Sequence, residues 1–173
     1  MLIMSEAIIN KPILSLRTGG EMATSVACLI NPNNLKIEAL YCIDRFDKTT
    51  KLLLSSDIRE IIKQGIVVND HDNLSDPNDL IRLKKIIKIN YTLIDKPVFT
   101  ESKKKIGKVA DFALDNQTMY IQKLYSSPTL MKTLTGKQLS IDRARIIEIT
   151  SRKIVIKDIE GTVRSSFLAA AGA

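Results

Sequence analysis

The sequence predicts an all-β dominated fold, in which two tandem small β-barrels are joined by a short α-helix. Three observations predict it: short apolar strands separated by turn residues, an internal repeat, and one segment between the copies with apolar residues at helical spacing. A length of 173 residues accommodates two small copies, and a hydrophobic content of 45% with 26% charged residues is typical of a folded chain.

The repeat is carried by segments that recur in the same order along the chain. The matched pairs are 11–15 with 96–100, 29–31 with 113–115, 35–41 with 119–125, 54–57 with 139–142, 61–62 with 146–147, and 66–70 with 154–158. Because the order is kept and the gaps are small, we interpret the chain as two copies of one fold. The predicted division is copy one at 1–75, a linker helix at 76–89, copy two at 90–163 and a C-terminal tail at 164–173.

Most of each copy is predicted to be strand. In copy one, the expected strands are 12–16, 24–30, 36–43, 51–54 and 66–69, with a brief helical or turn segment at 56–60. In copy two, they are 96–100, 108–114, 118–125, 138–141, 146–150 and 153–156. Short strands with turns every 8–12 residues or so are typical of a small barrel, and closing the sheet would remove its free edges.

The linker segment has its own pattern. Asp76 followed by Pro77 is typical of a helix N-terminus, and Leu80, Leu83 and Ile87 then recur at helical spacing. The sequence therefore predicts a helix over 77–88, whose apolar stripe packs on one or both barrels.

Several of these segments carry a family resemblance. The segments 96–98, 105–109 and 112–115 resemble the opening of the PRC-barrel domain, and 139–142 with 146–147 resembles its later part. Copy one is similar, although Ala23 stands where copy two has Gly107, and 54–61 closely matches the later part of the family pattern. The family includes the C-terminal domain of RimM-type ribosome-maturation factors and the barrel of the photosynthetic reaction-centre H subunit. The resemblance implies a small β-barrel that acts as an interaction module rather than as a catalyst.

The function predicted from this resemblance is a non-enzymatic interaction or adaptor protein with a protein partner. The alternative is an RNA- or ribosome-associated factor with a RimM-like role in ribosome maturation, because 26 Lys and Arg against 19 Asp and Glu give a formal charge of +7. An enzyme is the weakest interpretation, since one His leaves little room for a catalytic triad or a metal site. No catalytic, metal-binding or cofactor-binding residue is expected, and self-association stays open.

Two basic clusters and one apolar loop are the predicted partner-binding residues. These are Arg82, Lys84, Lys85 and Lys88 of the linker, Lys103, Lys104 and Lys105 of a turn, and Leu130, Met131 and Leu134 of a connection spanning 125–134. The lysine run has an alternative interpretation as a solvated tip that blunts a sheet edge. The apolar loop also has an alternative interpretation, in which it folds back over the mouth of the barrel.

Other residues are given structural interpretations. His71 is expected in a solvated turn, and Asp57 and Asp142 are expected to be equivalent residues that each begin a short turn and accept backbone N–H bonds. Gly19 with Gly20 predicts a hairpin turn.

The cysteines and the N-terminus bear on the compartment. Cys28 and Cys42 are expected to be small buried hydrophobes. The N-terminus has no basic region ahead of an apolar run, and no run approaches the roughly 20 residues that span a bilayer. We expect a cytoplasmic protein without a transmembrane segment, whose tail is frayed or forms a short helix.

Overall fold

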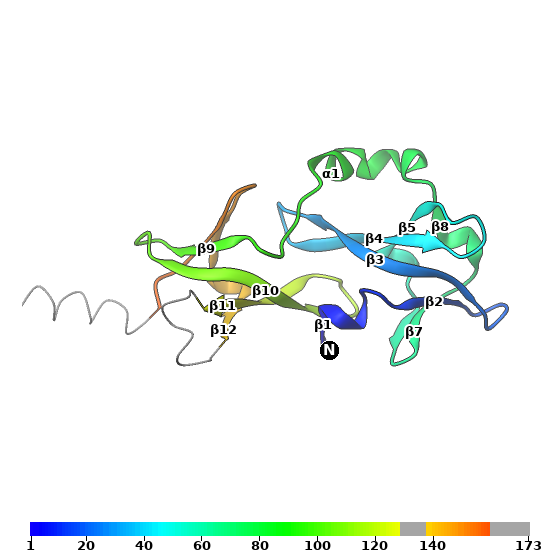
Figure 1. Ribbon diagram of the computed structural model, residues 1–173, viewed down its shortest axis with the longest axis horizontal. Helices are drawn as coiled ribbons and strands as arrows, with labels where there is room; N and C mark the ends of the chain where they lie inside the picture. Colours follow the sequence, from blue (N-terminus) through cyan, green and yellow to red (C-terminus); the bar gives the residue numbers. More distant parts are fainter. Residues whose placement is uncertain (129–137, 160–173) are drawn as a thin grey trace, which may run out of the picture. The chain divides into compact units, whose positions relative to one another are not determined.

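The computed structural model describes residues 1–128 and 138–159 (Figure 1). The chain divides into two compact units: unit 1 comprises Met1–Thr92 and Phe112–Gln122, and unit 2 comprises Leu93–Asp111 and Lys123–Ala173. The described part is mostly β, with two seven-stranded sheets and one short α-helix. Within it, no helix is long and apolar enough to cross a membrane.

The first sheet belongs to unit 1 and has the strand order β6-β7-β2-β3-β4-β5-β8. Its strands are β2 (Pro12–Ser15), β3 (Glu21–Asn31), β4 (Lys36–Asp44), β5 (Thr50–Leu54), β6 (Glu60–Ile62), β7 (Gly65–Val68) and β8 (Leu74–Ser75). The β2–β7 pair is parallel and the others are antiparallel. The 3-10 turns η2 (Ser55–Asp57) and η3 (His71–Asn73) connect strands within this sheet.

The second sheet has the strand order β12-β11-β10-β9-β14-β13, and β1 (Leu2–Met4) pairs with β10 off this path. Its other strands are β9 (Pro97–Thr100), β10 (Lys105–Asp115), β11 (Ile121–Pro128), β12 (Leu139–Asp142), β13 (Ile146–Ile149) and β14 (Ile154–Ile156). The turn η7 (Arg143–Arg145) follows β12, and η1 (Ser5–Ala7) follows β1. Again a single parallel pair, β9–β14, brings the first and last strands of the copy together.

The two sheets repeat one topology, and one of their irregularities coincides. In each sheet one strand, β2 or β9, lies between a long antiparallel strand, β3 or β10, and a parallel strand, β7 or β14. A bulge falls at the same place in both, because Met22 and Ile106 are skipped in the pairing of the first two strands. A shared bulge is a specific feature rather than a consequence of strand count, so it supports the interpretation of the chain as two copies of one fold.

The buried side chains repeat as well. Equivalent core positions that are at most 1% exposed are Ile13 and Val98, Leu40 and Leu124, Leu53 and Ile141, Ile66 and Ile154, and Val68 and Ile156. In β2 and β9 they alternate with more exposed residues. In β4 and β5 the neighbouring residues Ala39 and Leu52 are buried as well, because the linker covers the other face of the first sheet there. Burial of these branched side chains is therefore the main stabilising contribution within each copy.

The closed barrels predicted from the sequence are not found in the described residues. The strand order of the first sheet ends at β6 and β8, and that of the second ends at β13 and β12. The short strands β6 and β8 were not expected: the segment expected to be helical, 56–60, contributes only η2 before β6 begins at Glu60.

The predicted equivalence of Asp57 and Asp142 is wrong. In the strand pairing, Ala39 faces Leu54 in the first sheet, and Lys123, which stands at the position of Ala39, faces Asp142 in the second. Asp142 therefore corresponds to Leu54. The sequence similarity pairs Leu54 with Leu139, whereas the strand pairing makes Leu54 equivalent to Asp142.

The linker is less helical than its pattern predicts. Asp76 does accept a bond from the amide of Asn78 at 2.8 Å, but it begins a 3-10 turn, η4 (Pro77–Asp79). A second such turn, η5 (Ile81–Leu83), comes next and leads into α1 (Lys84–Ile89). Leu80, with ψ near 72°, is not helical and separates η4 from η5. The α-helix is thus six residues long and ends at Asn90, which adopts a left-handed conformation.

The apolar stripe of the linker packs on the first sheet, as expected. Leu80, Leu83, Ile86 and Ile87 contact a cluster formed by Leu29, Ala39 and Leu52 of β3, β4 and β5. Figure 1 shows α1 lying over the face formed by β3 and β4. Because an isolated helix this short is unstable in water, these contacts hold it in place.

Within unit 1, two equivalent hairpin tips bond to each other. The amide of Ile37 donates to the carbonyl of Met119, and the amide of Ile121 donates to the carbonyl of Leu35, each at 2.9 Å. Leu35 and Met119 are both buried and both have positive φ, 53° and 60°. The two bonds are reciprocal: the donors Ile37 and Ile121 are equivalent residues of the two copies, and so are the acceptors Leu35 and Met119.

Candidate functional site

The predicted basic residues of the linker form one exposed surface in unit 1. Arg82 lies in η5 and Lys84, Lys85 and Lys88 lie in α1, and all four are exposed. In the described part of the chain, none of the four has an acidic partner within ion-pair distance. Ile81 beside them is 81% exposed. These five residues are called the linker surface below.

A pocket of about 480 Å³ adjoins the linker surface. Leu80, Ile81 and Arg82 line it from the linker side, and Leu54 and Glu38 line it from the sheet. Apolar side chains beside charged ones suit the recognition of a side chain that carries both kinds of group.

The three predicted lysines of copy two lie at the β9–β10 turn of unit 2. All three are exposed, and Lys103 has a φ of 67°. The equivalent turn in copy one has the same two bonds around Gly19, whose φ is 71°. Copy two thus has a lysine in a left-handed conformation where copy one has a glycine, which adopts it at no steric cost.

A second pocket, of about 380 Å³, lies beside this turn within unit 2. Phe99 and Val155, which are neighbours in the parallel β9–β14 pair, contribute its apolar lining. Lys103 and Lys153 contribute cations, and Glu148, the strand partner of Val155, contributes a carboxylate. We call it the Phe99 pocket.

Sequence reasoning missed Lys153, although a signal was present. The two turns that carry Lys103 and Lys153 are 50 positions apart, and only the parallel pairing of β9 with β14 brings them to one pocket. The repeat aligns 66 with 154, so it also aligns Gly65 with Lys153. A comparison of the copies would have shown that both turns gained a lysine.

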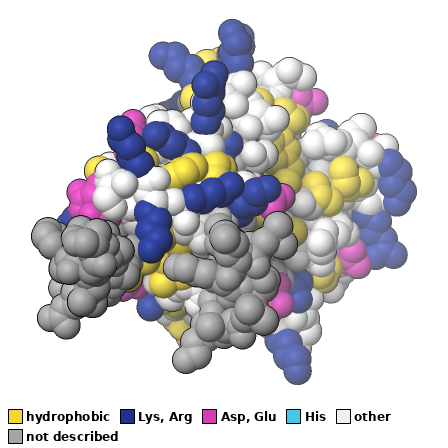
Figure 2. All heavy atoms as spheres, turned by 60° about the vertical axis from the view of Figure 1, so that its left-hand side comes forward, with side chains coloured by type: hydrophobic (Ala, Val, Ile, Leu, Met, Phe, Trp, Pro, Cys, Tyr) yellow, Lys and Arg dark blue, Asp and Glu magenta, His cyan; other side chains and the backbone are white. Residues whose placement is uncertain are grey.

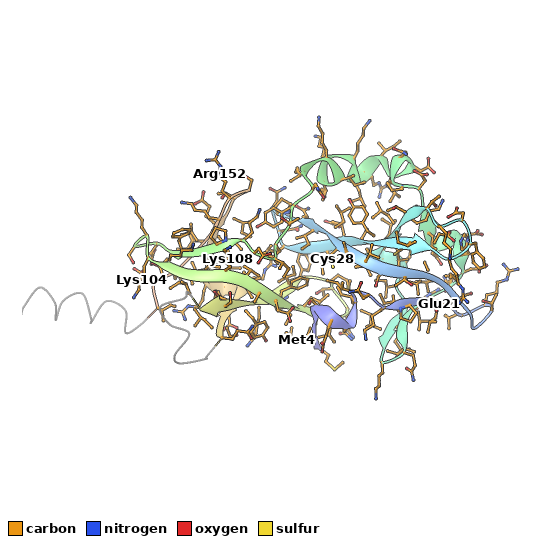
Figure 3. All side chains as sticks on the ribbon, in the orientation of Figure 1. Met4, Glu21, Cys28, Lys104, Lys108 and Arg152 are labelled. Atoms are coloured by element: carbon orange, nitrogen blue, oxygen red, sulfur yellow. The ribbon has the colours of Figure 1, made fainter. Side chains whose placement is uncertain are left out.

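The two units differ in charge more than in fold. Unit 1 contains 12 Lys and Arg and 12 Asp and Glu, whereas unit 2 contains 14 against seven. The entire formal charge of +7 therefore belongs to unit 2. Figure 2 brings forward the side with β9 and β10, on which Lys and Arg side chains gather around hydrophobic ones, and Figure 3 shows Lys104 and Arg152 at the β9–β10 and β13–β14 turns.

His71 is not simply a solvated turn residue, which corrects the prediction. Its Nε2 lies 2.7 Å from Oδ2 of Asp44, a buried carboxylate at the end of β4, and its ring packs edge-on against Phe46. The turn itself is as expected, with Asp70 and Asn73 forming a capping box. His71 thus partners a buried charge, while its own side chain stays 43% exposed.

Neither Asp57 nor Asp142 caps a turn with its side chain, which also corrects the prediction. The turns η2 and η7 begin without a side-chain cap bond. Asp142 instead pairs with Nζ of Lys123 at 3.3 Å. The Gly19–Gly20 segment, by contrast, does form the hairpin turn between β2 and β3.

The two cysteines lie in the first sheet as free thiols. Cys42 is fully buried and Cys28 is half-buried, so the expectation of burial is met for Cys42 and partly for Cys28. Desolvation raises the pKa of each thiol to about 12. A thiol with so high a pKa is a poor nucleophile at neutral pH, so neither cysteine is a candidate for catalysis.

The remaining predicted residues are placed as follows. Leu130, Met131 and Leu134 lie outside the described residues, and 125–128, expected to begin the connection, continue β11. The linker surface and the lysine turn belong to different units, and each stands as a site of its own. Among the residues that the structure describes, no group of three or more His, Cys, Asp and Glu could hold a metal ion.

The linker surface and the Phe99 pocket each combine exposed cations with apolar side chains, a combination that suits recognition of a partner. The sequence was compared with protein-family models and with curated proteins, and neither comparison gives a match.

Proposed function

We propose that the chain is a non-enzymatic interaction or adaptor protein, built from two tandem copies that resemble the PRC-barrel domain in sequence, that binds a protein partner through the linker surface. The observation that carries the proposal is Ile81, which is 81% exposed among four cations without acidic partners in the described chain. A large apolar side chain surrounded by charge is typical of the centre of an interface.

The architecture supports this proposal. The linker is held on the first sheet by Leu83, Ile86 and their neighbours, so its exposed side is presented on a fixed support. A surface that is ordered before binding loses less conformational entropy when a partner docks. The common topology and bulge of the two sheets support the tandem repeat, and the PRC-type assignment rests on the sequence resemblance.

The test is a quantitative comparison of captured proteins. Wild-type protein and Ile81→Ser are immobilised, and the proteins retained from a lysate of the source cells are measured by mass spectrometry. We expect one protein to be retained by the wild type and reduced at least fivefold with Ile81→Ser, because an anchor residue contributes about 1–2 kcal/mol or more to binding.

Leu16→Ser is the matched control, since Leu16 is a second large apolar side chain of unit 1 that is 62% exposed. It should retain the partner as the wild type does. Equal loss with both variants, or equal retention with both, would contradict a role for the linker surface.

The second candidate function is association with RNA or with the ribosome. The specific observation in its favour is that unit 2 contains the whole formal charge of +7, whereas unit 1 is neutral. Basic surfaces bind the phosphates of nucleic acids by releasing counterions.

Sedimentation of the native protein in a lysate gradient tests this second function. Comigration with ribosomes at low salt, lost with modest added salt or with nuclease, is the expected result, because counterion release makes such binding steeply salt-dependent. A light position in the gradient at both salt concentrations would exclude ribosome association.

A further inference from the structure

The two copies provide an internal comparison for the Phe99 pocket. At the positions of Phe99, Lys103 and Lys153, copy one has Leu14, Gly19 and Gly65. The strand register is the same in both, since Phe99 pairs with Val155 as Leu14 pairs with Val67. The aromatic ring and both cations are therefore additions to a common scaffold and not requirements of the fold.

One of the additions costs the fold conformational free energy. Lys103 has a φ of 67°, in the left-handed region that L-residues other than Gly, Asn and Asp rarely adopt. Its side chain is exposed, and in the described part of the chain it has no ion-pair partner that would repay this cost. Lys48 in unit 1 has the same backbone conformation, but Lys103 also lines a pocket, so its ammonium group is placed to contact a bound ligand.

The chemistry of the lining favours a nucleotide over an acidic peptide. Two lysines offer charge to phosphate, and the half-buried ring of Phe99 offers a surface on which a base can stack. Glu148 lines the same pocket, and Glu101 there accepts a bond from the amide of Asp158. These carboxylates repel any polyanion, so the preference comes from what else they and the ring can bind: a base has amino groups that donate hydrogen bonds to a carboxylate and a face that stacks on Phe99, and the side chains of a polyacidic peptide have neither.

We propose that unit 2 binds single-stranded RNA at the Phe99 pocket, with one base against Phe99 and the flanking phosphates at Lys103 and Lys153. This inference rests on the second candidate function and names its site and ligand class. The pocket volume of about 380 Å³ lies within the range of roughly 300–1,000 Å³ that small-ligand sites occupy, which suits one nucleotide of a strand.

The charge test uses fluorescence anisotropy with a labelled, unstructured RNA of about 12 nucleotides at low salt. Lys103→Gly introduces the residue that copy one has at this position. Glycine adopts a positive φ without steric strain, so the substitution should leave the turn intact. We expect it to weaken binding several-fold and to reduce the slope of log K against log salt by about 0.7 for the lost phosphate contact.

Lys48→Gly is the matched control for this variant. Lys48 is an exposed lysine in a turn of unit 1 with a φ of 61°, so the same substitution removes the same charge from the same conformation. It should bind RNA as the wild type does. Lys153→Ala has a matching control in Lys63→Ala, in the turn before β7.

The stacking test replaces Phe99 by the residue that copy one has. Phe99→Leu keeps an apolar side chain but removes the aromatic face, and it should weaken RNA binding roughly fivefold or more. Phe46→Leu removes an aromatic ring that is 71% exposed in unit 1 and should leave binding unchanged. Polyglutamate, used as the competing probe, should displace the RNA poorly.

The possible outcomes distinguish failure of the Phe99 pocket as the binding site from failure of RNA association itself. No RNA binding by the wild type at low salt overturns both the inference and RNA association. Wild-type binding that Lys103→Gly and Phe99→Leu leave intact overturns the Phe99 pocket as the site and leaves RNA association standing. Equal competition by polyglutamate overturns the nucleotide assignment and indicates an acidic protein partner.

Discussion

The contact between His71 and Asp44 shows how one side chain can hold a buried charge. Asp44 is fully buried, and its carboxylate accepts the amide of Phe46 at 2.8 Å and lies 2.7 Å from Nε2 of His71. A buried carboxylate is stable only when its oxygens have partners, because its desolvation is costly. His71 thereby connects η3 to the end of β4.

Removal of this partner should destabilise the protein. We expect His71→Ala to lower the free energy of unfolding by about 1–3 kcal/mol, because it leaves one oxygen of Asp44 buried without a bond. Urea unfolding measures this difference. Asp72→Ala, an exposed neighbour in the same turn, should have little effect, and equal losses with the two variants would show that the contact contributes nothing specific.

Gly107 is the second residue whose role is local and testable. A Cβ at this position would lie 1.8 Å from the carbonyl oxygen of Ser127 on β11. We expect Gly107→Ala to destabilise the protein by about 1–3 kcal/mol, since the two strands must separate to admit the methyl group. Gly20→Ala is the control, because a Cβ there meets only Thr18 Oγ1 at 3.5 Å. Comparable urea midpoints for both variants would contradict this explanation.

At the scale of single elements, the linker is an example of structure imposed by packing. Its helix is six residues long and has no side-chain cap bond at its start, so it depends on its contacts with β3, β4 and β5. Its position on the sheet follows from where these apolar side chains meet the sheet.

Loss of one of these contacts should release the linker. Ile86→Ala is expected to reduce stability by about 1–2 kcal/mol, because Ile86 is partly buried against the first sheet. The amide of Asn90, which bonds to the carbonyl of Ile86, should also exchange its hydrogen faster. Lys85→Ala, on the exposed side, should leave both quantities unchanged. Unchanged exchange in Ile86→Ala would mean that the helix is held by other contacts.

The sequence was sufficient for features that depend on local pattern. Alternation of apolar residues predicted most strands, and Gly19 with Gly20 predicted the first hairpin turn, because period and turn chemistry are read from neighbouring residues. The sequence was insufficient where the equivalence of two residues depends on the register of strand pairing. The 54–57 and 139–142 segments look alike but are not equivalent, since apolar strand ends resemble one another at several offsets.

The candidate sites divide in the same way. Exposure of the lysines in 82–88 and 103–105 was read from their spacing, whereas His71 and Asp44 are 27 positions apart and meet only through the pairing of β4, β5 and β8. Lys153 and Lys103 likewise meet through a parallel pair, a contact for which no short-range pattern exists. Long-range pairing is the part of the fold that composition and periodicity do not specify.

At the scale of the whole molecule, acid sensitivity follows from turns fixed by aspartates. The amide of Thr118 and neighbouring groups hold the pKa of Asp115 well below its ordinary value. The amide of His71 and the Arg17 guanidinium lower the pKa of Asp70, and the hydroxyl of Ser102 lowers that of Asp158. Each carboxylate favours the folded state only while it is ionised.

The direction of the pH dependence follows from these lowered pKa values. Above the ordinary aspartate pKa of 3.8 the stabilisation is complete, and it is lost as the pH falls from there through the lower folded-state values. Thermal unfolding between neutral pH and about pH 2 should therefore show a melting temperature that falls below about pH 4. Asp115→Asn should make this fall shallower, whereas Asp72→Asn should not. A melting temperature that is flat down to the lowest pH would contradict the role of these turns.

The reciprocal bonds between the hairpin tips have a historical consequence. The amide of Ile37 donates to the carbonyl of Met119 in the same way as the amide of Ile121 donates to that of Leu35. Two identical chains related by a two-fold axis form reciprocal contacts of this kind. Duplication and fusion of a gene for a self-pairing single-copy ancestor leaves this arrangement inside one polypeptide. After fusion the two copies are free to change separately, and they now differ in charge: copy one, 1–75, has 8 Lys and Arg against 9 Asp and Glu, whereas copy two, 90–163, has 13 against 8.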